Sequence, residues 1–376
     1  MSSGSDVSNL TPNQAPKRKR ILELDAIRAI SCLNLLMFHF TWVYAHKYGF
    51  TSPLVYMFPY GKYGVQLFFM LSGFVNMMTL IGKRSASDFL VARCIRIFPS
   101  YWLCILLNVL LFSFIPFFGN DVTLAGTMAN LSALPKLFGN SNMEPVTWTL
   151  QVEMLFYAFL ILMTAFGGWK NTLRNLMIGT VGCLVLCGGI HWIKAAWPES
   201  GLGSSLYVVE ELFILRNFPL FVMGMLLNEI YSKRGNHWMN VGGIVFAGFV
   251  FHAIDLRGHN PAATGLLFGM LAMGAYGKIP PLRWKPFVYI SSISYTLYLF
   301  HNNIGSCCIN QLQVFGLGPH VSIVVATGLM IALGAATTMW FEAPISGWLR
   351  KKYKSLKGQS PKTLSSGTSS GSKAGA

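Results

Sequence analysis

Long apolar runs alternate with short polar segments along almost the entire chain. Ten of the runs approach the about 20 residues that a helix needs to cross the ~30 Å hydrocarbon layer of a bilayer. They lie at residues 26–45, 64–82, 98–118, 146–168, 175–193, 211–229, 238–256, 261–277, 286–305 and 320–341. The pattern therefore predicts an all-α integral membrane protein with about ten transmembrane helices.

The composition supports a membrane protein and argues against a soluble enzyme. Hydrophobic residues make up 53% of the 376 residues and charged residues only 11%, whereas soluble domains carry about 25% charged residues. The seven cysteines are odd in number and form no CxxC pair. This usage is typical of neither a disulfide framework nor a zinc site, so we expect no metal.

The basic residues indicate the orientation of the chain. The formal net charge is +16, which in a soluble protein would suggest a nucleic-acid partner. If the chain crosses the membrane ten times, both termini lie on the same side. The segments on that side hold 22 of the 29 lysines and arginines, and the segments on the opposite side hold five. Positive charge marks the cytoplasmic side of membrane proteins. We therefore expect cytoplasmic termini, no nucleic-acid partner and no cleavable signal peptide.

Three regions follow from these patterns. Residues 1–20 are predicted to form a basic cytoplasmic tail, residues 21–350 a transmembrane domain, and residues 351–376, which are rich in Ser, Gly, Lys and Thr, a disordered cytoplasmic tail. Within the domain, the spacing of Gly265 and Gly269 predicts close packing of two helices.

Ionisable residues inside the predicted spans are candidates for chemistry, because charge in a bilayer is costly. The topology places five of them in one layer near the external face: His39, Glu153, His191, Arg216 and His301. An imidazole beside a carboxylate is the minimum apparatus for activating a hydroxyl group. Structural alternatives stay open: a hydrogen-bonded histidine at position 39, an interfacial role for His191, and an ion pair between Glu153 and Arg216.

Three arginines lie near the opposite, cytoplasmic ends of the spans. Arg28 opens the first span, and Arg93 and Arg96 precede the third. The planar guanidinium group suits phosphate oxygens, so this end is a candidate site for a substrate that carries phosphate. The alternative is that Arg93 and Arg96 only anchor the topology.

Six local motifs, in order along the chain, resemble those of acyltransferase family 3. The first is Arg28 followed by ten residues and His39. The others are Leu67–Phe74 (LFFMLSGF), Arg93–Trp102 (RCIRIFPSYW), Trp148–Tyr157 (WTLQVEMLFY), Ser294–His301 (SYTLYLFH) and Glu342-Ala343-Pro344. One departure is Met154, which follows Glu153 where the family motif more often reads V-E-E or V-E-x-Q.

The resemblance implies a membrane O-acyltransferase of the bacterial cytoplasmic (inner) membrane. Such an enzyme moves an acetyl group from cytoplasmic acetyl-CoA to a hydroxyl group of a cell-surface or exported polysaccharide. The extracytoplasmic esterase-like domain of some members is not found in this sequence. Transfer would therefore finish within the membrane domain or involve another protein, such as a polysaccharide-assembly protein.

The resemblance also suggests roles for individual residues. His39 would be the general base or a transient acyl carrier, Glu153 would orient it or balance its charge, and Arg28, Arg93 and Arg96 would hold the CoA phosphates. Ser72, Arg216, Tyr295 and His301 would line the substrate path. The competing hypotheses are a secondary transporter, an acyltransferase that acts on a non-glycan small molecule such as a macrolide, and an inactive family member that serves as an assembly partner.

Overall fold

The computed structural model describes residues 20–81, 86–115, 122–198, 206, 209–210, 214–255 and 258–358, and within them every regular element is helical. The all-α prediction is confirmed for this part of the chain. The predicted tails at residues 1–19 and 359–376 lie outside it. The principal helices are α1 (Leu22–Phe38), α2 (Tyr44–Lys47), α3 (Gly64–Ile81), α4 (Ala86–Phe114), α5 (Leu124–Leu131), α6 (Trp148–Ala165), α7 (Thr172–Ala196), α9 (Phe218–Tyr231), α10 (His237–Ile254), α11 (Pro261–Ala275), α12 (Lys285–Phe300), α13 (Asn303–Val314), α14 (Pro319–Thr337) and α15 (Ala343–Gly358).

Each of the ten predicted stretches contains a helix, but the helices differ in length. Among the described residues, seven helical segments are long and apolar enough to cross a membrane. They are Leu22–Lys47, Pro59–Leu80, Ala86–Phe114, Pro145–Ala165, Gly168–Ala196, His237–Ile254 and Pro319–Gly358. The helices α9 and α11 are apolar but shorter, and α12 has 16 residues. The chain is therefore a multi-pass membrane protein, and the number of ten spans stays a prediction.

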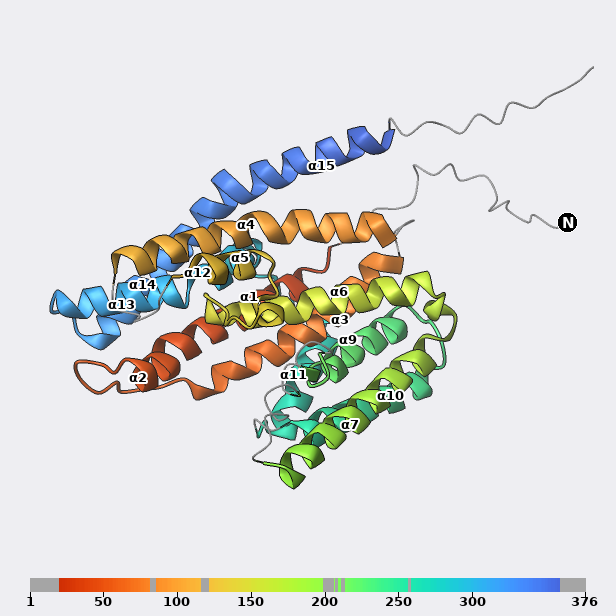
Figure 1. The fold of residues 1–376 in the computed structure, drawn as a ribbon. Helices are drawn as coiled ribbons and strands as arrows, with labels where there is room; N and C mark the ends of the chain where they lie inside the picture. Colours follow the sequence, from red (N-terminus) through yellow and green to blue (C-terminus); the bar gives the residue numbers. More distant parts are fainter. Residues whose placement is uncertain are drawn as a thin grey trace, which may run out of the picture.

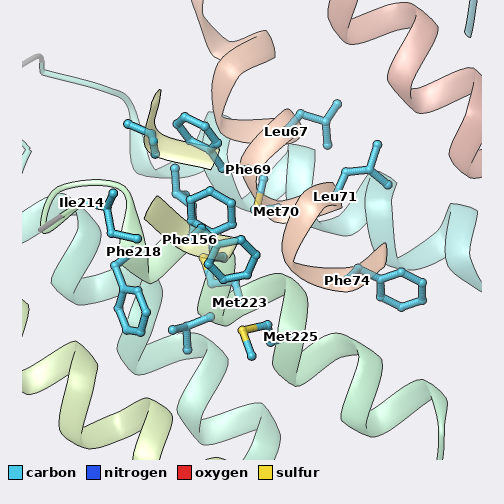
Figure 2. Packing of buried hydrophobic residues seen from close by; sticks show 14 of the residues in the cluster. Leu67, Phe69, Met70, Leu71, Phe74, Phe156, Ile214, Phe218, Met223 and Met225 are labelled. Atoms are coloured by element: carbon cyan, nitrogen blue, oxygen red, sulfur yellow. The ribbon is translucent and has the colours of Figure 1, made fainter. Parts of the chain in front are cut away.

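The centre of the molecule is the contact between α3 and α9, where two backbones touch. A Cβ atom added at Gly224 would lie 1.9 Å from the carbonyl oxygen of Met70, and one at Gly73 would lie 2.2 Å from that of Phe221. Only glycine permits such an approach. Figure 2 shows the side chains packed around this contact, including Phe156, whose ring stacks on that of Phe221 with centroids 3.9 Å apart.

The predicted glycine contact was placed on the wrong helix. A Cβ atom at Gly265 or Gly269 of α11 would meet nothing within 4 Å. In Figure 1, α7, α9, α10 and α11 lie together on one side of the molecule and α13 and α14 on the other, with α1 and α3 between them. The helix α1 packs against both α3 and α12, and so it holds the two sides together.

Two π-helical turns interrupt this arrangement at motif residues. One spans His39–Val43 and continues α1, and the other spans Thr338–Glu342 between α14 and α15. Such turns are rare and occur frequently at functional sites. The first one begins at the candidate base, His39.

Residues 351–358 were predicted to belong to a disordered tail, but they form the end of helix α15. This helix continues to Gly358 and runs beside α4 (Figure 1). Pro99 lies inside α4 and cannot donate a backbone hydrogen bond to the carbonyl group of Ile95. Ser346 of α15 donates its hydroxyl group to that carbonyl oxygen instead, at 3.1 Å. The proline of the third motif thus creates the acceptor that helps to fix α15.

Candidate functional site

A small internal cavity brings together six of the nine predicted site residues. It has a volume of about 110 Å³ and lies between α1, α3, α4, α6 and α12. The predicted residues that line it are Arg28, Ser72, Arg93, Arg96, Glu153 and Tyr295. We call it the arginine chamber.

Glu153 is the carboxylate of the arginine chamber. It accepts hydrogen bonds from the hydroxyl groups of Tyr157 and Ser72, the latter at 3.1 Å, and Ser72 in turn accepts one from the Asn76 amide at 2.8 Å. Glu153 also interacts electrostatically with Arg28. The carboxylate therefore belongs to the arginines rather than to the imidazole of His39.

The three arginines are held by different kinds of contact. The guanidinium group of Arg93 lies over the rings of Phe89 and Tyr157, 5.2 and 5.5 Å from their centroids. Arg28 lies 3.6 Å from the Asp25 carboxylate, and Arg96 lies close enough to Arg28 to repel it electrostatically. Like charges are kept together only at a cost, so this cluster of three arginines is a candidate site for an anion.

A second cavity contains His39. It has a volume of about 240 Å³, and its lining includes His39, Arg216, Asp255 and His259. We call it the histidine chamber. His301 does not line it but lies behind His39, with 3.1 Å between His301 Nε2 and His39 Nδ1.

The hydrogen bonds around this pair of histidines assign their tautomers. His301 Nδ1 lies 2.7 Å from the carbonyl oxygen of Tyr298, and His39 Nδ1 lies 2.8 Å from that of Leu35. A carbonyl oxygen only accepts, so in both neutral rings the proton is on Nδ1. His39 Nδ1–H then lies between two acceptors, the Leu35 oxygen and His301 Nε2. This tautomer leaves His39 Nε2 as the proton-accepting atom of a ring that lines the chamber.

The cavities follow one another through the helix bundle. The arginine and histidine chambers share Leu35, Val65 and Tyr298 in their walls. On its other side, the arginine chamber shares Arg28, Val75, Arg93 and Arg96 with an open cleft of about 820 Å³. We call this the basic cleft.

The predicted single layer of ionisable groups divides into separate clusters. Arg216 donates two hydrogen bonds to Glu210, at 2.7 and 2.6 Å, and His191 Nε2 lies 3.1 Å from the same carboxylate. Arg216 thus pairs with Glu210, so the alternative of an ion pair with Glu153 was wrong. Glu210 is buried, and the sequence reasoning had not considered it.

Sequence reasoning also missed an acid–base pair in the histidine chamber. His259 donates its backbone N–H to Asp255 Oδ2 at 2.8 Å, and its ring Nδ1 lies 2.9 Å from the same oxygen. The ring packs edge-on against Tyr63, with centroids 5.4 Å apart. The only local signal was the spacing of four residues between an acid and a histidine in a polar loop, which is too common to select the pair.

Glu144 is the second missed carboxylate. It is fully buried and accepts hydrogen bonds from the Asn302 side chain at 2.9 Å and the Asn303 backbone at 3.2 Å. Burial raises the pKa of the Glu144 carboxyl to about 7, against the opposing effect of these hydrogen bonds. Because Asn302 and Asn303 directly follow His301, Glu144 holds the segment that supports the histidine pair.

Comparison with known proteins decides the family. The family model of the acyltransferase domain of acyltransferase family 3 matches residues 21–339. The chain belongs to this family. The family is one of enzymes that transfer acyl groups, and its motifs provide the arginines and Glu153 of the arginine chamber and His39 of the histidine chamber.

A curated relative has a related sequence over most of its length. The chain is 30% identical over 309 residues to the exopolysaccharide production protein ExoZ of Rhizobium meliloti (strain 1021), and the match covers 78% of this chain and 86% of that protein. No solved structure matches the chain.

Proposed function

We propose that this protein is an O-acetyltransferase that moves acetyl groups from cytoplasmic acetyl-CoA to a hydroxyl group of an exported or cell-surface polysaccharide. The observation that carries the proposal is the series of cavities. A strongly basic cleft leads to the arginine chamber, which shares a wall with a chamber that contains a proton-accepting imidazole. The name of the relative, an exopolysaccharide production protein, favours a polysaccharide as the acceptor.

The spacing along α1 matches the shape of the donor. Arg28 and His39 are eleven residues apart, about 16 Å along a helix. CoA carries its phosphates at one end of an extended pantetheine arm and its thioester at the other. Phosphates bound at Arg28, Arg93 and Arg96 would therefore leave the thioester near the wall that the two chambers share.

The transfer needs one proton acceptor on the side of the hydroxyl group. In the proposed step, His39 Nε2 accepts the hydroxyl proton while the hydroxyl oxygen attacks the thioester carbonyl carbon. The C–S bond then breaks, and the proton passes from His39 to the CoA sulfur, which leaves as a thiol. If His39 instead carries the acetyl group transiently, the same Nε2 atom is the nucleophile.

The test is transfer by the purified protein in proteoliposomes. We expect radiolabelled acetyl-CoA to give label in alkali-labile ester linkage on a de-esterified exopolysaccharide. Label on a small hydroxylated molecule such as a macrolide, but not on the polysaccharide, would change the acceptor class. If neither transfer nor acetyl-CoA hydrolysis occurs while solute uptake does, the transporter hypothesis replaces this one.

The proposed direction of transfer requires a specific orientation in the bacterial inner membrane. Both termini and the segment around Lys233 would be cytoplasmic, and the segment around Leu137 external. Reporter fusions at Ser355, Lys233 and Leu137 test this arrangement. An external signal at Ser355 would reverse the proposed sides of donor and acceptor.

A further inference from the structure

The helix α15 forms one wall of the basic cleft. Its residues in the lining are Arg350, Tyr353, Lys354 and Lys357. Ser346 lies four positions before Arg350. The spacings that follow, to Tyr353, Lys354 and Lys357, are three, one and three positions, so all five residues lie on one face of a helix. The segment that composition predicted to be disordered from residue 351 therefore presents an ordered basic face.

Both ends of this face are fixed to α4. Near the start of α15, the Ser346 hydroxyl group donates to the Ile95 carbonyl oxygen. Near its end, Asp88 of α4 accepts a hydrogen bond from the Tyr353 hydroxyl group at 2.9 Å and binds the Lys357 ammonium group at 2.6 Å. Arg350 and Lys354 lie between these anchors, on the wall that faces Arg93 and Arg96.

The charge of the cleft suits a ligand with several phosphate groups. Among the described residues that line it, seven are basic and two are acidic. Asp25 lies 2.5 Å from Arg20 and 3.6 Å from Arg28, and Asp88 binds Lys357. Both carboxylates are thus engaged by neighbouring cations, and the remaining charge is positive. The volume of about 820 Å³ is in the range of small-molecule and cofactor sites.

We propose that α15 completes the donor site by binding the phosphate group on the CoA ribose through Arg350 and Lys354. The CoA diphosphate then lies at Arg28, Arg93 and Arg96, and the pantetheine arm extends into the arginine chamber. This assignment rests on the proposed function, because it takes an acyl-CoA as the donor. The shared chemistry is a phosphate group, and the alternative source of that group is an anionic lipid at the membrane surface.

The experiment measures KM for three donors with the full-length protein in liposomes. The donors are acetyl-CoA, acetyl-dephospho-CoA (which lacks the ribose phosphate) and acetyl-pantetheine. We expect Arg350→Gln and Lys354→Gln each to raise KM for acetyl-CoA about three- to twentyfold, the range for charge-assisted contacts at a partly exposed site. KM for the other two donors should not change.

Lys352→Gln is the matched control. Lys352 lies on the opposite side of α15, with its ammonium group 5.0 Å from the centroid of the Trp348 ring. Removing its charge changes the net charge of α15 by the same amount but leaves the cleft intact, so all three KM values should stay at the wild-type level.

Several outcomes would overturn the assignment. An equal rise in KM for all three donors would mean that α15 supports the fold or a step common to all donors. An effect that disappears in liposomes without anionic lipid would identify a lipid headgroup as the ligand. A wild-type protein that uses none of the donors would overturn the proposed function as well. Unchanged KM values in Arg350→Gln and Lys354→Gln, with wild-type transfer intact, would overturn only the role of α15.

Discussion

The arginine chamber and the histidine chamber are neighbours, yet they hold different chemistry. The first contains three guanidinium groups and the Glu153 carboxylate. The second is lined by His39, with His301 behind it, by the Asp255–His259 pair, and by the two cations Lys62 and Arg216. Arg28 and His39 are eleven residues apart, about 16 Å along a helix, so the candidate anion site and the candidate base lie at different places in the bundle.

The wall between the chambers shows how they are kept distinct. It consists of Leu35, Val65 and Tyr298. The hydroxyl group of Tyr298 is already engaged, since it donates to the Val146 carbonyl oxygen at 2.8 Å and lies 2.7 Å from the Thr149 hydroxyl oxygen. Charged groups thus line the chambers, while the wall that they share is largely apolar.

The strongest test of this division removes the base. His39→Ala should lower transfer about 10²- to 10⁴-fold, because that is the usual contribution of a general base. Acetyl-CoA binding should stay near the wild-type level, because the arginine chamber keeps all its charged groups. Transfer in membranes and equilibrium binding of acetyl-CoA provide the two measurements.

His46→Ala is the matched control, since His46 lies two turns further along the same helical segment. Its Nδ1 atom lies 2.7 Å from the carbonyl oxygen of Trp42, a contact of the same type as the one between His39 and Leu35. This variant should transfer acetyl groups normally. Retention of more than about half of the wild-type activity in His39→Ala would contradict the catalytic assignment.

The second test addresses the arginine chamber. Arg96→Lys should raise KM for acetyl-CoA about tenfold and leave KM for the polysaccharide unchanged, because an ammonium group cannot reproduce the two-pronged contact of guanidinium with phosphate. If Arg96 only anchored the topology, Arg96→Lys should leave KM for acetyl-CoA unchanged, since Lys and Arg count alike for orientation. Normal KM with normal membrane insertion would return Arg96 to the role of an anchor.

The third test concerns His301 as a positioning residue. His301→Phe keeps a ring but removes one of the two acceptors for His39 Nδ1–H and leaves the Leu35 carbonyl oxygen, so we expect kcat to fall about fivefold, the value of one hydrogen bond of about 1 kcal/mol. His301→Gln retains an acceptor and should recover part of the activity. A purely structural role predicts instead that both variants lose thermal stability and that kcat follows the amount of folded protein.

The sequence predicted the elements of this molecule better than their contacts. Apolar runs placed a helix in each of the ten stretches, because length and hydropathy are local properties. The close contact between α3 and α9 was missed, and Gly265 and Gly269 were chosen instead. The spacing of glycines along one helix does not show whether a second helix packs against them. The order of α15 was missed for a similar reason. Its composition is polar, and its partners, Ile95 and Asp88, are more than 250 residues earlier.

The candidate site shows the same limit. Motifs identified Arg28, Arg93 and Arg96, and the fold brings them to one cavity. Depth alone grouped His39 with Glu153, whereas the structure places the carboxylate with the arginines. Depth fixes a position along the membrane normal but not around the helix axis. Partners from distant loops, such as Glu144 and Asp255, could not be found without the fold.

The last and smallest expected effect concerns the support of the histidine pair. Glu144 is buried, and its pKa is raised from 4.5 to about 7 in the folded protein. Between pH 4.5 and about 7, the folded protein therefore holds a proton on Glu144 that the unfolded protein has largely released. The contribution of this proton to the free energy of unfolding is fully present below pH 4.5 and is lost as the pH rises through about 7. It amounts to a few kcal/mol at most.

Glu144→Gln replaces the carboxyl with a neutral group of similar shape. It should remove this fall in stability, so the difference in Tm between pH 5 and pH 8, measured in detergent, should shrink by a few degrees (about 2–4 °C per kcal/mol for a large domain). The Tm at pH 5 should change little, since the wild-type carboxyl is then already protonated. An unaltered pH dependence in the variant would mean that other groups cause it and that Glu144 stays charged among its amide donors.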